Sequence, residues 1–255
     1  MVKRSELENK IKEKILLIGD SATGKTYTVA KVAGYVAGNG KKVVLIDPEY
    51  GAERELELLP DDILENIELR VTPDWLKTKE ALEKPDADCF LKMLDGLGDV
   101  FEQSMTYLNE RFLGQGYYSA GDAEKEIKHK ETFVFPWSAY PKVYDDVRKT
   151  VRMLCLKQAP HIICTMHSFG EAETRQRLTE DIYRKFDTTI TLRREIVDYT
   201  DTVTREQTKK FEYQAILNKH RGKPITAFAM LKDHVGQLNK LFAKRMGMDY
   251  VEGSN

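Results

Sequence analysis

The chain has 255 residues, of which 41% are hydrophobic and 32% charged, and 40 basic side chains balance 41 acidic ones to a formal net charge of −1. This length can bury a sizeable core in one large or two small domains. The even balance excludes a histone-like nucleic-acid binder, whose affinity comes from a general excess of Lys and Arg. It leaves room for a local basic face.

The cysteines and the chain start indicate the compartment. Cys89, Cys155 and Cys164 lie in apolar surroundings without the spacing of a zinc site, which also argues against a disulfide framework. The first 14 residues are highly charged, and no stretch reaches the roughly 18 uncharged residues of a membrane span. We therefore expect a cytoplasmic protein with no membrane contact.

Short apolar runs alternate with helical patterns in the first part of the chain. The continuous apolar run at 15–18 is typical of a strand covered on both faces, and it is followed by Gly19. Residues 26–37 then have the pattern of a helix of small residues. Further strands are predicted at 43–46 and 67–71, with a short helix at 53–59.

The second part is less regular. We expect a helix from about 86 to 112, a loop rich in Gly and charge at 114–130, a strand at 132–135, a helix at 141–157 and a strand at 161–165. From 187 onward the sequence is rich in Thr, Val, Ile and Tyr, which favours antiparallel strands and hairpins.

The alternation of strands and helices predicts an α/β fold with a mostly parallel sheet and helices on both faces. We expect one domain over 1–255. It would carry a helical and loop excursion at about 85–131 and end in a short amphipathic helix at 236–246.

A phosphate-binding motif directly follows the first strand. The sequence GDSATGKT matches G-x-x-x-x-G-K-T and opens a helix. In such a loop backbone N–H groups point at phosphate oxygens, and the helix N-terminus adds its positive dipole end. The alternative is an ordinary Gly-rich turn. The residues expected to border the nucleotide are Gly19, Asp20, Ser21, Ala22, Thr23, Gly24, Lys25, Thr26 and Tyr27.

Two of these residues have defined chemical roles. Lys25 would neutralise the β- and γ-phosphates, and the Thr26 hydroxyl would bind the Mg²⁺ that bridges them. The cofactors expected are therefore ATP or ADP together with Mg²⁺.

Two carboxylates follow the second strand, in VVLIDPEYG. Asp47 and Glu49 should lie at the carboxyl edge of the sheet, where ligands bind in open α/β folds. Hydrolysis needs a group that orients or deprotonates the attacking water, and a carboxylate can do this. The alternative is that both acids cap the following helix.

The order of GDSATGKT, a helix, a short basic link and VVLIDPEYG resembles the RecA-like ATPase superfamily, which includes recombinases, replicative helicases and KaiC-type proteins. The resemblance covers roughly residues 11 to 230. It implies a three-layer RecA-like P-loop fold in which antiparallel C-terminal strands extend the sheet. It also implies that Glu49 is the catalytic base and that Asp47 is a supporting or metal-side carboxylate.

Two later segments are similar to other parts of that superfamily. In HIICTMH, His167, with Thr165 second, matches a polar sensor of the γ-phosphate; the alternative is a structural histidine. In ILNKHRGKP, Lys219 and Arg221 match residues that reach the neighbouring protomer's γ-phosphate in a hexamer or filament. The alternative for this pair is a solvated hairpin tip.

One expected feature is missing. In the superfamily a strand ends in an aspartate that orients Mg²⁺, but the strand predicted at 132–135 is followed by Pro-Trp-Ser. Ser138, Asp145 or Asp146 could substitute, although the two acids look like the exposed face of a helix. The gap argues against efficient hydrolysis but not against nucleotide binding.

Charge is unevenly distributed, with 16 acidic and 6 basic residues in 44–100 but 13 acidic and 18 basic in 151–255. The basic half makes DNA a possible partner of an oligomeric motor, although aromatic residues are not visibly interleaved with these charges as single-strand binding prefers. The alternatives are a slow regulatory or assembly ATPase and a small-molecule kinase with Arg175, Arg177 and Arg184 in its lid. The candidate DNA contacts are Arg175, Arg177, Arg184, Lys185, Arg193, Arg194, Lys209 and Lys210.

Overall fold

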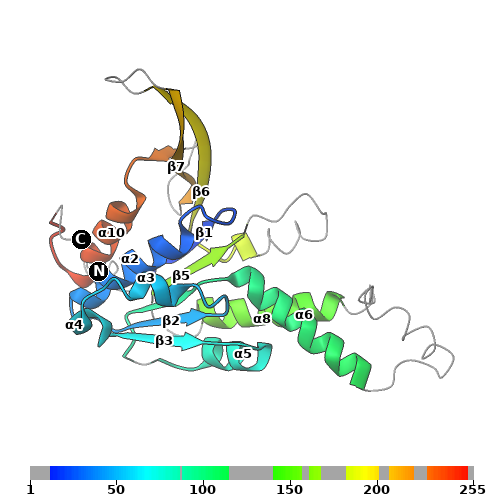
Figure 1. Ribbon diagram of the computed structural model, residues 1–255. Coiled ribbons are helices and arrows are strands. Elements are labelled where there is room, and N and C mark those ends of the chain that lie inside the picture. Colours follow the sequence, from blue (N-terminus) through cyan, green and yellow to red (C-terminus); the bar gives the residue numbers. More distant parts are fainter. Residues whose placement is uncertain are drawn as a thin grey trace, which may run out of the picture.

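The computed structural model describes residues 12–86, 88–114, 140–156, 161–167, 182–200, 207–220 and 229–251. These residues form one eight-stranded sheet in the order β3-β2-β4-β5-β1-β6-β7-β8 (Figure 1). Strands β1 to β6 pair in parallel, and β7 and β8 extend the sheet antiparallel. The strands are β1 (Lys14–Ile18), β2 (Val43–Asp47), β3 (Ile67–Val71), β4 (Leu91–Leu94), β5 (His161–Met166), β6 (Thr188–Thr200), β7 (Gln207–His220) and β8 (Ala229–Leu231).

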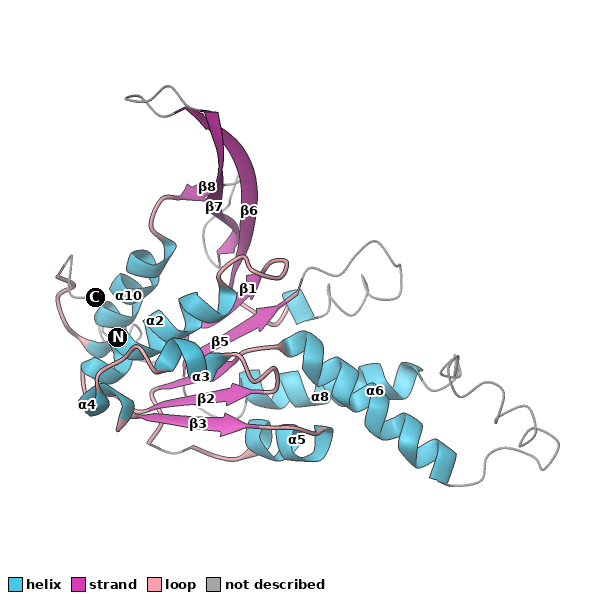
Figure 2. Ribbon diagram, viewed as in Figure 1, coloured by secondary structure: helices cyan, strands magenta, loops and turns pink. Residues whose placement is uncertain are grey.

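Helices cover both faces of the sheet and make three layers (Figure 2). Successive strand residues point to opposite faces, so Ile15 and Leu17 join one apolar cluster while Leu16 and Ile18 join the other. One face carries α2 (Lys25–Gly38), α3 (Ala52–Leu56), α4 (Asp61–Leu64) and α10 (His234–Met246), and the other carries α5 (Trp75–Glu83), α6 (Leu97–Gly114) and α8 (Tyr140–Leu156).

The predicted α/β fold class is confirmed: a mostly parallel sheet lies between helices on both faces and is extended by antiparallel C-terminal strands. One prediction within it is wrong: the helix expected from about 86 to 112 is interrupted by strand β4, and α6 begins only at Leu97. The strand predicted at 132–135 and nearly all of the 114–130 loop lie outside the described residues. Within the described ranges no helix is long and apolar enough to cross a membrane.

Strand β4 was missed because it carries a lysine. Lys92 is 1% exposed, and its ammonium donates to the carbonyls of Leu82 at 3.2 Å and Lys84 at 3.1 Å. It also pairs with Asp86 at 2.9 Å. These partners compensate the burial of a charge that would otherwise be very costly in a central strand.

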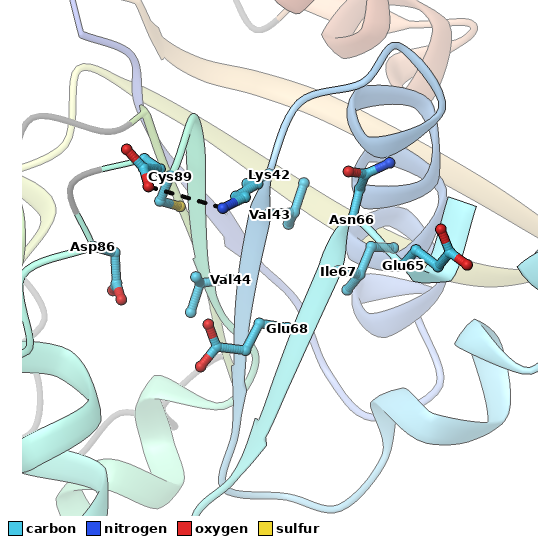
Figure 3. A pocket seen from close by; sticks show the side chains of 10 residues that line it. Lys42, Val43, Val44, Glu65, Asn66, Ile67, Glu68, Asp86 and Cys89 are labelled. Carbon is cyan, nitrogen blue, oxygen red and sulfur yellow. Dashed lines mark ion pairs between the residues drawn. The ribbon is translucent and has the colours of Figure 1, made fainter. Parts of the chain in front are cut away.

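Asp86 is shared by two cations. Its carboxylate also accepts from Arg70 of β3 at 2.6 and 3.2 Å. Burial raises the pKa of Asp86, but hydrogen bonds from Arg70 and Lys92 outweigh this effect and hold the pKa below its usual range. A pocket lined in part by Asp86 lies at the amino ends of β2 and β3 (Figure 3). Two other lining residues, Lys42 and Asp88, form an exposed ion pair.

Asp86→Ala should destabilise the protein by about 3–5 kcal/mol, since it leaves two cations poorly paired, one of them fully buried. Chemical denaturation measured by circular dichroism tests this. Asp88→Ala is the matched control, because the Asp88 side chain is 84% exposed and its pair with Lys42 spans 3.9 Å. Equal unfolding midpoints for the two variants would contradict the assigned role of Asp86.

Candidate active site

The carboxyl ends of four parallel strands meet at one edge of the sheet, where ligands bind in open α/β folds. The phosphate loop lies between β1 and α2 (Figure 1), and Glu49 follows β2. Asp95 follows β4, and His167 follows β5. Residues far apart in the sequence are therefore gathered around the start of α2.

The geometry of the phosphate loop depends on glycine at two positions. Gly24 has a φ of +88° and precedes α2 without a side-chain cap, so the amides of the first helical turn remain available to a ligand. A Cβ on Gly19 would lie 2.5 Å from the Leu192 carbonyl oxygen and 2.6 Å from the Thr23 hydroxyl. Only glycine fits there, because β6 passes directly beside the loop.

Lys25 lies inside the loop rather than in solvent. Its side chain donates to the carbonyls of Gly19 at 3.0 Å and Asp20 at 2.9 Å, and its Nζ is 3.4 Å from Nδ1 of His167. Burial lowers the pKa of Lys25, and nearby carboxylates, Glu49 foremost, oppose this. A buried cation thus faces the space enclosed by the loop.

Four of the predicted nucleotide contacts, those at 20–22 and 27, are exposed. Asp20, Ser21 and Ala22 lie at the surface, and Ala22 has a φ of 60°. Tyr27 is 47% exposed on the first turn of α2, with the Lys31 ammonium 5.7 Å from its ring centre. Contact of these side chains with a nucleotide stays a prediction.

The carboxylate that the sequence analysis did not find is Asp95. It directly follows β4, is 1% exposed, and accepts a 2.6 Å hydrogen bond on Oδ1 from the Thr165 hydroxyl. The aspartate expected after a strand was sought behind the stretch at 132–135, which lies outside the described residues, and Asp95 after β4 is a candidate for it. Of the proposed substitutes, Asp145 is exposed on α8 and paired with Lys149 at 2.5 Å, while Ser138 lies outside the described residues.

The second oxygen of Asp95 is the group best suited to a metal ion. Within the described part of the chain, the buried Oδ2 has no hydrogen-bond partner. Burial raises the pKa of Asp95, and the hydroxyls of Thr165 and Thr26 oppose the rise. Because Mg²⁺ prefers hard oxygen ligands, Thr26 and Asp95 form a fitting donor pair beside the phosphate loop.

Asp47 is held by the backbone of its own loop. It is fully buried, and its carboxylate accepts from the backbone amides of Glu49 at 3.0 Å and Ala52 at 2.8 Å. These bonds fix the turn that carries Glu49 and satisfy the start of α3, as the supporting or helix-capping role would require. Because both of its oxygens are occupied, Asp95 offers the more available oxygen to a metal ion, and the metal-side role of Asp47 stays a prediction.

Glu49 belongs to a cluster of three side chains. One ligand-type atom each of Glu49, Asp99 and His167 lies within 4.8 Å of the others, and His167 Nε2 is 3.3 Å from Glu49 Oε1. Burial, together with the neighbouring Asp99 carboxyl, raises the pKa of Glu49 to about 8. Without nucleotide, Glu49 thus tends to hold a proton, which a base must first lose.

Asp99 was also missed by the sequence analysis. It lies in the first turn of α6, four residues after Asp95. The linking Gly96 has a φ of +111°, and a Cβ there would be 2.7 Å from Glu49 Cγ and 3.0 Å from Asp99 Oδ2. The one signal in the sequence was the spacing of the two acids in LDGLGD, which becomes informative only once LKML is identified as a strand.

Of the two residues matched to a trans-acting role, the structure describes Lys219, which lies away from this site. β7 is antiparallel, and its last residue, His220, pairs with Thr188 at the amino end of β6. Lys219 is therefore at the sheet edge opposite the phosphate loop, where its ammonium donates to the carbonyls of Tyr183 at 3.0 Å and Phe186 at 2.7 Å. Arg221 lies outside the described residues, so a role in a neighbouring protomer stays a prediction.

Comparison with known proteins finds matches in structure but none among protein families or curated sequences. No protein family matches the chain, and no curated protein matches it significantly. Of the 333 solved chains that match in structure, one is the ATPase domain of G40P, at 13% identity and a TM-score of 0.49. That similarity covers 85% of this chain and 79% of the other. Assignment of the site rests on its own geometry.

Glu49→Gln should change how stability depends on pH. A raised pKa means that the folded state holds more protons than the unfolded state between the ordinary value of 4.5 and about 8. Stability of the wild type therefore falls as pH rises through this window, and Gln removes the effect. A pKa raised from 4.5 to about 8 corresponds to about 5 kcal/mol, so between about pH 5 and pH 8.5 the variant should gain roughly 10–20 °C in Tm over the wild type.

The measurement is thermal unfolding of both proteins without nucleotide or divalent cation across this pH range. A difference in Tm that stays constant with pH would show that the Glu49 carboxyl titrates near its ordinary value.

Proposed function

We propose that the chain binds ATP with Mg²⁺ and hydrolyses it to ADP and phosphate. One observation carries the proposal: among the described residues, Oδ2 of the buried Asp95 carboxylate has no hydrogen-bond partner, and Asp95 lies next to Thr26 of a phosphate loop that already contains a buried lysine. A buried polar atom without a partner needs an explanation, and a bound metal ion is one that fits beside a phosphate loop.

Different groups of the site would bind the phosphates and the metal ion. Backbone amides at the start of α2 donate to phosphate oxygens, and Lys25 exchanges its two carbonyl partners for the β- and γ-phosphates. Thr26 and Asp95 would hold Mg²⁺. When bound, Mg²⁺ neutralises charge on the transferring phosphoryl group.

Glu49 is the proposed base for the attacking water. Its loop is fixed by Asp47, and its carboxyl lies near His167, whose other ring nitrogen is near Lys25. His167 therefore links the base to the phosphate-binding cation, which suits the sensor role. Arrival of a cation and movement of Glu49 away from Asp99 would both lower its pKa toward the deprotonated form that catalysis needs.

Assembly and a role in DNA metabolism are the finer parts of the proposal. The proposed contacts to a neighbouring protomer are Lys219 and Arg221, and one observation supports an action in trans for Lys219: it lies at the sheet edge away from its own phosphate loop. A hexamer or filament would bring such an edge to a neighbour's nucleotide. Exposed basic residues for DNA contact are Arg184, Lys185, Arg193, Arg194, Lys209 and Lys210.

Asp95→Asn should lower the Mg²⁺-dependent kcat by at least about a hundredfold, because it removes an anionic metal ligand from the site. Glu49→Gln should do the same while keeping ATP affinity, whereas Lys25→Ala should lose affinity. Phosphate release and binding of a fluorescent ATP analogue measure the two effects. Asp145→Asn, an exposed carboxylate on α8, is the control.

If Asp95→Asn hydrolyses ATP as fast as the control, Asp95 is not part of the reaction. If Lys25→Ala binds the analogue as the wild type does, the loop does not hold the nucleotide.

The turnover per protomer should rise with protein concentration if Lys219 and Arg221 complete a neighbour's site. Light scattering read beside the rate, with and without single- and double-stranded DNA, tests this. A monomer whose rate is independent of concentration would contradict the assembly. An oligomer whose rate ignores DNA would contradict the DNA role and favour a regulatory ATPase.

A further inference from the structure

The long hairpin of β6 and β7 projects beyond the body of the protein (Figures 1 and 2). β6 is paired to β1 only as far as Thr191, and β7 is paired to β8 only from Ala215 onward. From Arg193 outward the two strands therefore have only each other as partners among the described residues. A two-stranded ribbon of this kind is marginally stable by itself.

One face of this ribbon continues the core of the protein into solvent. Residues paired across the strands share a face, and Leu192 with Ala215 is buried on this one. The next pairs on the same face are Arg194 with Tyr213 and Ile196 with Phe211. We call these four residues the hairpin stripe.

The hairpin stripe is apolar, aromatic and exposed. Ile196 is 65% exposed, Phe211 56% and Tyr213 59%. The Arg194 guanidinium lies 4.7 Å from the Phe211 ring centre, in cation–π geometry. Cross-strand pairing explains why these residues are neighbours, but more than half of the accessible surface of Phe211 and of Tyr213 stays exposed to solvent. Exposed apolar surface of this kind is typical of an interaction site.

Charge on this face favours an anionic partner. Among its described side chains beyond the body, Arg194 and Lys209 are basic and Asp198 is acidic, and Asp198 is directly opposite Lys209. Arg194 is opposite Tyr213, so among the described pairs of this face it is the basic residue with no acidic residue directly opposite. The expectation that no aromatic residue accompanies the basic ones is wrong here, since the fold sets Phe211 and Tyr213 beside Arg194.

We infer that the hairpin stripe binds single-stranded nucleic acid by stacking bases on Phe211 and Tyr213, with Arg194 and Lys209 contacting the backbone. Alternate residues of a strand are about 6.8 Å apart. Bases in a duplex rise by about 3.4 Å, so two rings at this spacing suit unstacked bases rather than a duplex. The inference rests on the proposed function, since it names the polymer on which the ATPase would act.

The test uses the full chain without nucleotide, so that failure of hydrolysis does not affect it. Fluorescence anisotropy is read with a labelled oligo(dT) of about 30 nucleotides, an oligo(rU) of the same length and a duplex. The wild type should bind the single strands more tightly than the duplex. The oligo(dT) and oligo(rU) arms decide between DNA and RNA, which share the stacking chemistry.

The Phe211→Ala/Tyr213→Ala variant should bind the single strands at least about tenfold more weakly, since each stacked base contributes about 1–3 kcal/mol. Both side chains are exposed, so folding should be kept. Phe211→Trp should retain binding. Leu76→Ala, a 54% exposed side chain on α5, is the matched control. The ATPase rate without nucleic acid should be the same in all of them.

Three results would overturn the inference. The wild type could bind no single strand, or the double variant could bind as the control does. The double variant could also change only the size measured by light scattering, which would assign the hairpin stripe to contact between copies of the chain. Loss of ATPase activity with intact single-strand binding would instead contradict the proposed function alone.

Discussion

The hydrogen bond from the Thr165 hydroxyl to the buried Asp95 carboxylate joins the ends of β5 and β4 at the centre of the site. The same hydroxyl accepts from the Gly96 amide at 2.8 Å, so one side chain sets the turn that leads into α6. This turn brings Asp99 to Glu49 and leaves room only for glycine between them. The bond occupies one oxygen of Asp95, and within the described ranges the other oxygen has no hydrogen-bond partner.

Among the described residues, the site combines several acids with one buried cation, Lys25. Carboxylates of Glu49, Asp95 and Asp99 act on Lys25 and on one another, and burial amplifies their mutual repulsion. A nucleotide triphosphate would add further negative charge. A divalent cation bound between Asp95 and the phosphates would relieve this repulsion, which is why the proposed activity depends on Mg²⁺. The net charge of −1 therefore conceals a strongly acidic site.

Local patterns predicted the phosphate loop, because strand, glycines, lysine and helix start are contiguous in GDSATGKT. They also predicted that the acids after β2 lie at the sheet edge, but they left open whether Asp47 faces a metal ion or binds the backbone amides at the start of α3, as it does. Asp95 was missed because Lys92 breaks the apolar run of a four-residue strand. The residue that makes such a lysine tolerable, Asp86, lies in the preceding loop and is bridged to Arg70 of β3. The charge of Lys92 is thus compensated by residues from other elements of the fold, and the hydrophobic periodicity of the sequence does not show such contacts.

The most direct test of the account is a crystal structure of the wild-type protein with Mg²⁺ and a non-hydrolysable ATP analogue. The account predicts triphosphate oxygens on Lys25 and the first amides of α2, and Mg²⁺ bound by Thr26 and by Asp95, directly or through one water. It also predicts Glu49 turned away from Asp99 toward the γ-phosphate. Mg²⁺ held by Asp47, or an analogue bound away from Lys25, would contradict it.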